Sequence, residues 1–168
     1  MTAPAEAVPV PVPFPKQVRD VVGGLLGREV TVRPGDPVLP GPDRPAPVAV
    51  YVDARTHTGA LVAVDLGLAA GIGAALGLVP PGVVDECTAQ GALRQDLAEN
   101  FYEVVNVLAS VFNEKQGAPH QRLYHLHPAG DRLPGDVAGW LAQLGRRLDL
   151  AVSVEGYVDG GMSVVAVG

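Results

Sequence analysis

The sequence predicts an α+β domain with a mostly antiparallel sheet. Two pairs of strand-like segments, 47–54 with 59–65 and 148–158 with 161–167, are each joined by a short polar turn. Such a link is too short for the crossover that parallel strands need, so each pair is expected to form a hairpin. Helical segments lie between these hairpins instead of alternating with single strands, an order typical of α+β proteins. The 168 residues, 48% of them hydrophobic, suffice for one packed core.

Proline determines the expected structure of the first 47 residues. Residues 1–15 are rich in Pro and Val, and proline neither fits a helix interior nor donates a ladder hydrogen bond. We therefore expect an extended, spacer-like tail ahead of one domain, 16–168. Apolar residues three and four apart predict a helix over 16–27, and alternation over 28–33 predicts a strand. The stretch 34–47, again rich in Pro and Gly, predicts a loop.

The remaining elements follow the first hairpin. The small-residue segment 66–78 predicts a helix that two prolines end. The longest helix is expected near 92–114, and Cys87 lies ahead of it in a stretch that resembles a turn. Segment 121–127 is expected to be a strand and 135–147 a helix, before the closing hairpin around the turn Asp-Gly.

Composition and charge exclude several classes of function. The chain has 12 basic and 18 acidic residues and a net charge of -6 without a basic stripe, so nucleic acid is not an expected partner. No apolar run reaches the ~18 residues of a membrane span, and the N-terminus lacks the pattern of a secretory signal. We expect a cytoplasmic protein with no membrane partner. The single cysteine, Cys87, can form neither an internal disulfide nor a multi-cysteine metal site.

The long helix is the strongest candidate for function. On a helical wheel its apolar residues gather on one side, and its polar residues gather on the other: Glu99, Glu103, Asn106, Ser110 and Asn113. The polar side contains no Lys or Arg, although both are good helix formers. An acidic face without its own counter-charges either is simply solvated or awaits the cation of a partner.

The spacing on this face resembles a known signature. Glu99, three residues, Glu103, two residues, Asn106, 21 residues and Pro128 is similar to the pattern of the CheC/CheX/FliY family: an acidic residue or Ser, x3, Glu, x2, Asn, x21, Pro. The order of elements is also similar over most of 16–168. One such motif is present, which looks more like CheX than the two-site CheC.

The resemblance implies a function and a set of roles. These proteins dephosphorylate the receiver protein CheY in bacterial chemotaxis, so the expected partner is a phosphorylated CheY-like receiver. Asn106 would hold the attacking water in line with phosphorus, and Glu103 would pair with the receiver's conserved Lys. The receiver would supply Mg²⁺, and this chain needs no metal or other cofactor of its own. The residues expected around the partner are Glu99, Tyr102, Ser110 and Asn113, and Pro128 is a structural part of the motif.

Two other readings stay open for this face. Glu99, Tyr102 and Ser110 stand where the family prefers Asp or Ser, a small residue, and Gly. A binding module of the same fold, which docks a receiver or switch protein without hydrolysis, therefore remains an alternative. The other alternative is a structural protein whose polar helix face is an assembly surface, and a homodimer is itself implied by the CheX resemblance.

Two weaker patterns suggest sites that we do not expect. The glycines of 71–77 follow a strand, as in a dinucleotide-binding turn, but they fall inside the predicted helix, where close helix packing explains them better. His120, His125 and His127 are close in sequence but lack a further ligand at a matched spacing, so a zinc site is not expected.

Overall fold

The computed structural model describes residues 7–167, and the expected α+β class is confirmed. The helices and strands, in chain order, are α1 (Pro15–Leu26), β1 (Val30–Pro34), β2 (Val48–Val52), β3 (Thr58–Val64), α2 (Leu66–Leu76), α3 (Gly82–Gln90), α4 (Gln95–Leu108), the 3₁₀ turn η1 (Ala109–Phe112), β4 (Arg122–His127), α5 (Gly135–Leu141), β5 (Arg147–Val154) and β6 (Gly160–Ala166). None of the helices within 7–167 combines the length and the apolar character that crossing a bilayer requires.

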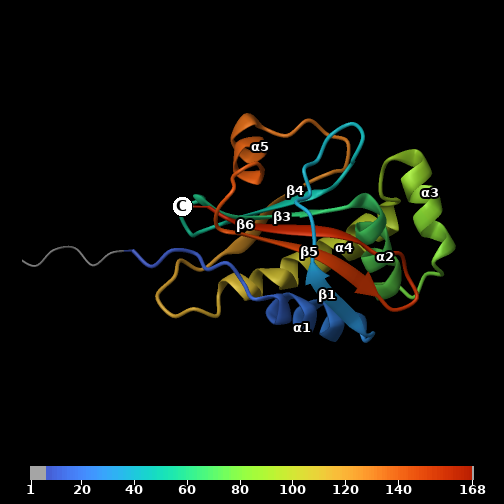
Figure 1. Ribbon diagram of the computed structural model, residues 1–168, viewed down its shortest axis with the longest axis horizontal. Coiled ribbons are helices and arrows are strands. Elements are labelled where there is room, and N and C mark those ends of the chain that lie inside the picture. Colours follow the sequence, from blue (N-terminus) through green and yellow to red (C-terminus); the bar gives the residue numbers. More distant parts are fainter. Residues whose placement is uncertain (1–6, 168) are drawn as a thin grey trace, which may run out of the picture.

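The six strands form one antiparallel sheet in the order β1-β5-β6-β3-β2-β4, which leaves β1 and β4 at the edges. Figure 1 shows α1 and α4 on one side of this sheet and α5 on the other. Hydrophobic residues are packed on both faces of the sheet, and the side chains of β2 point to the two faces in turn. Ala49 and Tyr51 contact the layer of α1, α2 and α4, whereas Val48 and Val50 contact the layer of α5. Both expected hairpins are present.

The structure corrects two local expectations. Cys87 lies in the helix α3, where it is buried with Val83 and Val84, and not in a turn. Three buried positions over nine residues make a stripe too short for the sequence to reveal before its neighbour α2 is known. The helix expected over 135–147 ends at Leu141, because the chain from Arg147 onward pairs with β6.

The proline-rich tail is attached to the domain where it is described. Its first six residues lie outside the described part of the chain, and 7–14 form neither helix nor strand. Val10 is 5% exposed and belongs to the main core, and the side chain of Arg146 donates a hydrogen bond to its carbonyl oxygen. This part of the tail is thus a packed arm and not the expected spacer.

Helix α4 lies unusually close to α2 because of a glycine. A Cβ atom at Gly73 would lie 2.5 Å from the carbonyl oxygen of Leu97, so any larger residue would force the two helices apart. The Asn100 amide also donates a hydrogen bond of 3.0 Å to the carbonyl oxygen of Gly73. The glycines of α2 thus serve helix packing, which is the function that the sequence favoured for them.

A buried tyrosine fixes α4 to the sheet. The Tyr51 hydroxyl on β2 donates a 2.6 Å hydrogen bond to the carbonyl oxygen of Val105, and the Tyr51 and Phe112 rings lie 5.1 Å apart. Complete burial raises the pKa of Tyr51, so its hydroxyl stays protonated and remains a donor. Together with Gly73, this bond determines which side of α4 faces solvent.

We predict opposite effects for two Gly→Ala substitutions in helices. Gly73→Ala should lower the free energy of unfolding by about 1–3 kcal/mol, because its methyl group overpacks the α2–α4 contact. Gly24→Ala in α1, where a Cβ meets no atom within 4 Å, should raise it by about 0.5–1 kcal/mol through helix propensity. Urea unfolding measures both, and equal effects at the two positions would contradict the packing role of Gly73.

Candidate functional site

Helix α4 is amphipathic, as expected. It buries Leu97, Phe101, Val104, Val105 and Leu108 and turns its polar side chains outward. Arg94, at the N-cap position, binds both carboxylate oxygens of Asp96 at 2.6 and 2.7 Å, and this pairing lowers the pKa of Asp96. The negative charge of Asp96 in the first turn also suits the helix dipole. At its other end the helix tightens into η1.

Glu103 and Asn106 both lie on the exposed side of α4. Asn106 is three positions after Glu103 in the helix, so the two lie about 4.5 Å apart along the axis, close to one turn from each other. Within 7–167 neither side chain makes a hydrogen bond, and Glu103 forms no ion pair with a Lys or Arg. A free carboxylate and a free amide therefore project next to each other from a well-anchored helix.

Two exposed hydrophobic side chains flank this pair. Tyr102 is 45% exposed and Val107 is 36% exposed. Each directly adjoins one member of the pair in sequence. The exposed aromatic ring is the part of this surface that is typical of protein–protein contacts, where aromatic residues are enriched.

Two of the other expected contact residues, Glu99 and Ser110, are exposed and can reach a partner. Glu99 is exposed, and among the described residues its carboxylate accepts one long hydrogen bond, of 3.5 Å, from the Gln95 amide. Ser110 is exposed on η1, beyond the end of α4. These two residues border the Glu103–Asn106 pair on either side along the helix.

Asn113 departs from its expected place on the free polar face. It follows η1, where the chain has left the α-helical path, so the helical wheel no longer applies to it. Its amide nitrogen donates to the carbonyl oxygen of Gln121 at 2.9 Å, and its amide oxygen accepts from the Gln121 N–H at 2.8 Å. Asn113 therefore closes the 113–121 loop, and we no longer count it among the contact residues.

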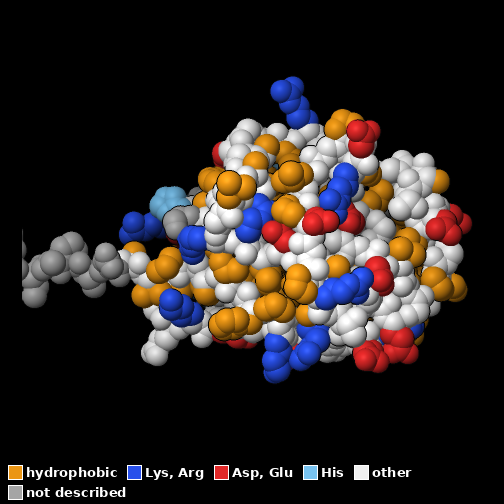
Figure 2. Space-filling view, in the orientation of Figure 1, with side chains coloured by type: hydrophobic (Ala, Val, Ile, Leu, Met, Phe, Trp, Pro, Cys, Tyr) orange, Lys and Arg blue, Asp and Glu red, His pale blue; other side chains and the backbone are white. Residues whose placement is uncertain are grey.

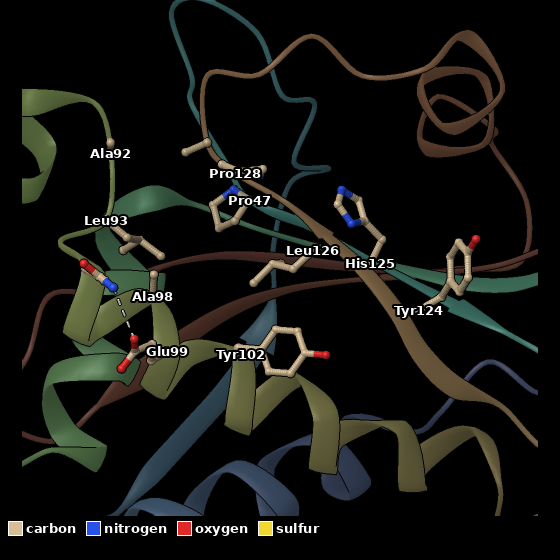
Figure 3. Close-up of a pocket in the computed structure, with 12 residues that line it drawn as sticks. Pro47, Ala92, Leu93, Ala98, Glu99, Tyr102, Tyr124, His125, Leu126 and Pro128 are labelled. Carbon is tan, nitrogen blue, oxygen red and sulfur yellow. Dashed lines mark hydrogen bonds between the residues drawn. The ribbon is translucent and has the colours of Figure 1, made fainter.

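Pro128 lies directly after β4 and lines a groove between β4 and α4. The groove has a volume of about 650 Å³ and is lined mainly by apolar atoms. Figure 3 shows Tyr102 and Ala98 of α4 on one side and Leu126, His125 and Tyr124 of β4 on the other. Sequence reasoning did not find this groove, although the alternating exposed residues of the predicted strand 121–127 are a weak sign of it.

The histidines form a pair and not a three-ligand cluster. The His125 and His127 rings meet edge to face at 4.4 Å, and burial followed by the neighbouring His125 lowers the pKa of His127. Within 7–167 no group of three or more His, Cys, Asp or Glu side chains is placed to hold a metal ion. On the face shown in Figure 2, basic and acidic side chains are interspersed.

Comparison with known proteins identifies the fold. No family model matches the sequence, and no curated protein matches it. The structure is similar to the chemotaxis protein CheX from Vibrio vulnificus, with a TM-score of 0.53 and 17% identity over 99% of this chain and 100% of that one. It is also similar to the FliM middle domain from H. pylori, with a TM-score of 0.53 and 10% identity over 90% and 86% of the two chains.

A chain in the FliM-SpeE complex from H. pylori matches as well, with a TM-score of 0.57 and 8% identity over 90% of this chain and 80% of that one. The predicted CheX-like fold is thus confirmed. Because the identities are this low, the likeness defines the fold, and any activity must be argued from the residues of the site.

Two asparagines should differ sharply in their effect on stability. Asn106→Ala should change the free energy of unfolding by less than about 0.5 kcal/mol, because the side chain is exposed and has no hydrogen-bond partner in the described part of the chain. Asn113→Ala should lower it by about 1–3 kcal/mol, because it removes two hydrogen bonds to the backbone of Gln121. Urea unfolding provides the comparison, and a large loss in Asn106→Ala would mean that Asn106 has a structural role.

Proposed function

We propose that this protein dephosphorylates the phospho-aspartate of a CheY-like receiver domain. The observation that carries the proposal is the pair Glu103 and Asn106, exposed one turn apart on α4 and without a partner in the described part of the chain. The motif spacing from Glu99 to Pro128 and the fold shared with CheX support the same assignment. The proposed setting is a bacterial two-component pathway in the cytoplasm.

Asn106 is assigned the role of positioning water. An amide both accepts from and donates to one water molecule, and can therefore orient its lone pair toward phosphorus. The water oxygen then forms a bond to phosphorus while the bond from phosphorus to the aspartate oxygen breaks. The products are a free aspartate and inorganic phosphate, so the step needs no nucleophile from this chain. Orientation contributes much of such a rate, because phosphoryl transfer requires little covalent chemistry from the protein.

Glu103 is assigned to docking. Its carboxylate has no Lys or Arg partner among residues 7–167, so a lysine on the receiver can bind it without first breaking an internal pair. An ion pair at this position fixes how far along α4 the receiver lies, and hence where Asn106 meets the phosphoryl group. Mg²⁺ belongs to the receiver in this proposal and neutralises charge on the phosphoryl oxygens there.

The anchoring of α4 supports a positional mechanism. Tyr51 and Gly73 hold the helix at Val105 and Leu97, residues that lie close in sequence to the functional pair. Displacing a reacting group by about 1 Å can cost roughly 100-fold in rate, so a rigid helix suits an amide whose role is to place one water.

A second function, docking without hydrolysis, has one observation in its favour. Tyr102 is 45% exposed and lies four residues before Asn106, at neighbouring positions on the surface of α4, where an aromatic side chain adds contact area for a partner. The fold is also that of FliM, which was crystallised in a complex with another protein, SpeE. A binding module would use the same surface, and the measurements below distinguish the two functions. A homodimer remains a prediction in either case.

The catalytic role of Asn106 is tested by phosphate release. CheY-like receivers of the source organism, phosphorylated with a small acyl phosphate donor, are mixed with the protein, and the rate above autodephosphorylation is measured. Asn106→Ala should lower this rate by roughly 100-fold while binding of the receiver is retained. Gln116→Ala, which removes an exposed amide from the loop after η1, is the control and should keep the full rate. Equal rates for the native protein and Asn106→Ala would remove the catalytic proposal.

The docking role of Glu103 makes a separate prediction. Glu103→Ala should weaken binding of the phosphorylated receiver by about 3- to 10-fold, as expected for a partly exposed ion pair. Glu103→Lys should weaken it further, because it places a cation opposite the receiver's lysine. The difference should shrink as salt rises. Glu155→Lys makes the same charge change on the β5–β6 loop and should leave binding unaffected; an equal loss there would indicate a general charge effect instead of a specific pair.

A further inference from the structure

The groove between α4 and β4 has the composition of a pocket for one partner segment. Its walls are apolar, formed largely by Leu93, Ala98 and Leu126 with Pro47 and Pro128 next to each other at one end (Figure 3). Ala98 contributes only a methyl group to the wall near Leu93 (Figure 3), and Leu93 and Leu126 are partly exposed. A volume of about 650 Å³ accommodates one or two side chains of a partner, not a whole element.

The polar groups that line the groove are one carboxylate, the imidazole of His125 and uncharged amide and hydroxyl groups. Glu99 is its only carboxylate, and no Lys or Arg lines it. The hydroxyl groups of Tyr102 and Tyr124 make no hydrogen bond within the described residues. Tyr102 lies three residues after Glu99 on α4, so the Glu99 carboxylate and the exposed Tyr102 ring can together attract a cation. The Tyr124 ring already has the guanidinium of Arg122 over it, 5.9 Å from its centroid, and contributes apolar surface to the groove instead. The complementary occupant therefore carries a Lys or Arg next to an apolar side chain.

The groove is continuous with the surface that holds Glu103 and Asn106. Tyr102 lines the groove and precedes Glu103 directly, and Glu99 lies one turn before Glu103 on the same helix. A protein that places its phosphorylated aspartate at Asn106 therefore also passes over the mouth of the groove. The same partner can fill both sites in a single docking event.

We propose that this groove is the specificity site for the receiver, and that it takes an apolar side chain and an adjacent Lys or Arg from the receiver surface beside the phosphorylation site. The inference rests on the proposed function for the identity of the partner. The groove selects which receiver binds, and Glu103 and Asn106 act on whichever receiver is selected.

Filling the groove tests this inference without changing the functional pair. Ala98→Leu keeps a good helix former at the position while its side chain occupies the space. Tyr124→Thr removes an exposed ring from the edge strand and keeps a residue that favours strands. The matched control is Ala138→Leu on α5, an exposed alanine on the opposite side of the sheet. Circular dichroism and urea unfolding establish that all three variants are folded.

The receiver is chosen from a panel of CheY-like receivers as the one that the native protein binds most tightly. Its binding is measured after activation with beryllium fluoride, and its turnover is measured after phosphorylation with acetyl phosphate. Ala98→Leu and Tyr124→Thr should each raise Kd about tenfold, as for a central interface residue, whereas Ala138→Leu should change it less than about twofold. In turnover the loss should fall on KM, in contrast with Asn106→Ala, whose loss falls on kcat. Glu99→Gln should flatten the salt dependence of Kd.

The outcomes separate this inference from the proposed function. If the Kd of both groove variants is within twofold of the native value while Asn106→Ala abolishes turnover, the proposed role of the groove is overturned and the proposed phosphatase activity is supported. If a receiver binds without dephosphorylation and the groove variants weaken that binding, the proposed phosphatase activity is overturned and the proposed role of the groove is supported. If no receiver binds the native protein, both are overturned.

Discussion

The close contact of α4 with α2 and β2 is the constraint on which the candidate site depends. Gly73 allows the backbones of the two helices to approach, and the Tyr51 hydroxyl holds the carbonyl group of Val105 from the sheet side. Each contact involves a fully buried group, so rotating α4 about its axis would break a buried hydrogen bond and expose the apolar stripe. The side of the helix that carries Glu103 and Asn106 is therefore held toward solvent by interactions on its opposite side.

Leaving the outer side of α4 unpaired costs the fold little. Glu99 and Glu103 are four residues apart on an exposed surface, where water weakens their repulsion to a few tenths of a kcal/mol. The chain does neutralise charge elsewhere: Arg147 pairs with Asp149 at 2.9 Å, and Arg44 pairs with Asp65 at 2.7 Å. The lack of a cation beside Glu103 is thus a local feature of this face, and it is what makes the face suited to a cationic partner.

CheX and the FliM middle domain have similar folds, so the fold alone does not determine function, and a few exposed residues must do so. In the proposed division of roles, Asn106 orients water, Glu103 sets the position of the partner, and the groove beside Ala98 selects the partner. These three roles lie along about two turns of one helix, from Ala98 to Asn106. Such a helix can change its chemistry or its partner by single substitutions on its outer side, while the buried residues that fix its position stay the same.

The sequence by itself determined the antiparallel hairpins, the amphipathic long helix and the polar spacing of Glu99, Glu103 and Asn106, because these depend on local periodicity and on turns of a few residues. It could not reveal α3, whose buried stripe has meaning only against α2, nor the packed arm around Val10. Only the tertiary structure decided that Asn113 is occupied by the backbone of Gln121 and that β4 and α4 enclose a groove. The groove arises from α4 and β4, which meet only when the sheet forms. The Asn113 bonds close a loop of irregular course, which hydrophobic periodicity does not encode.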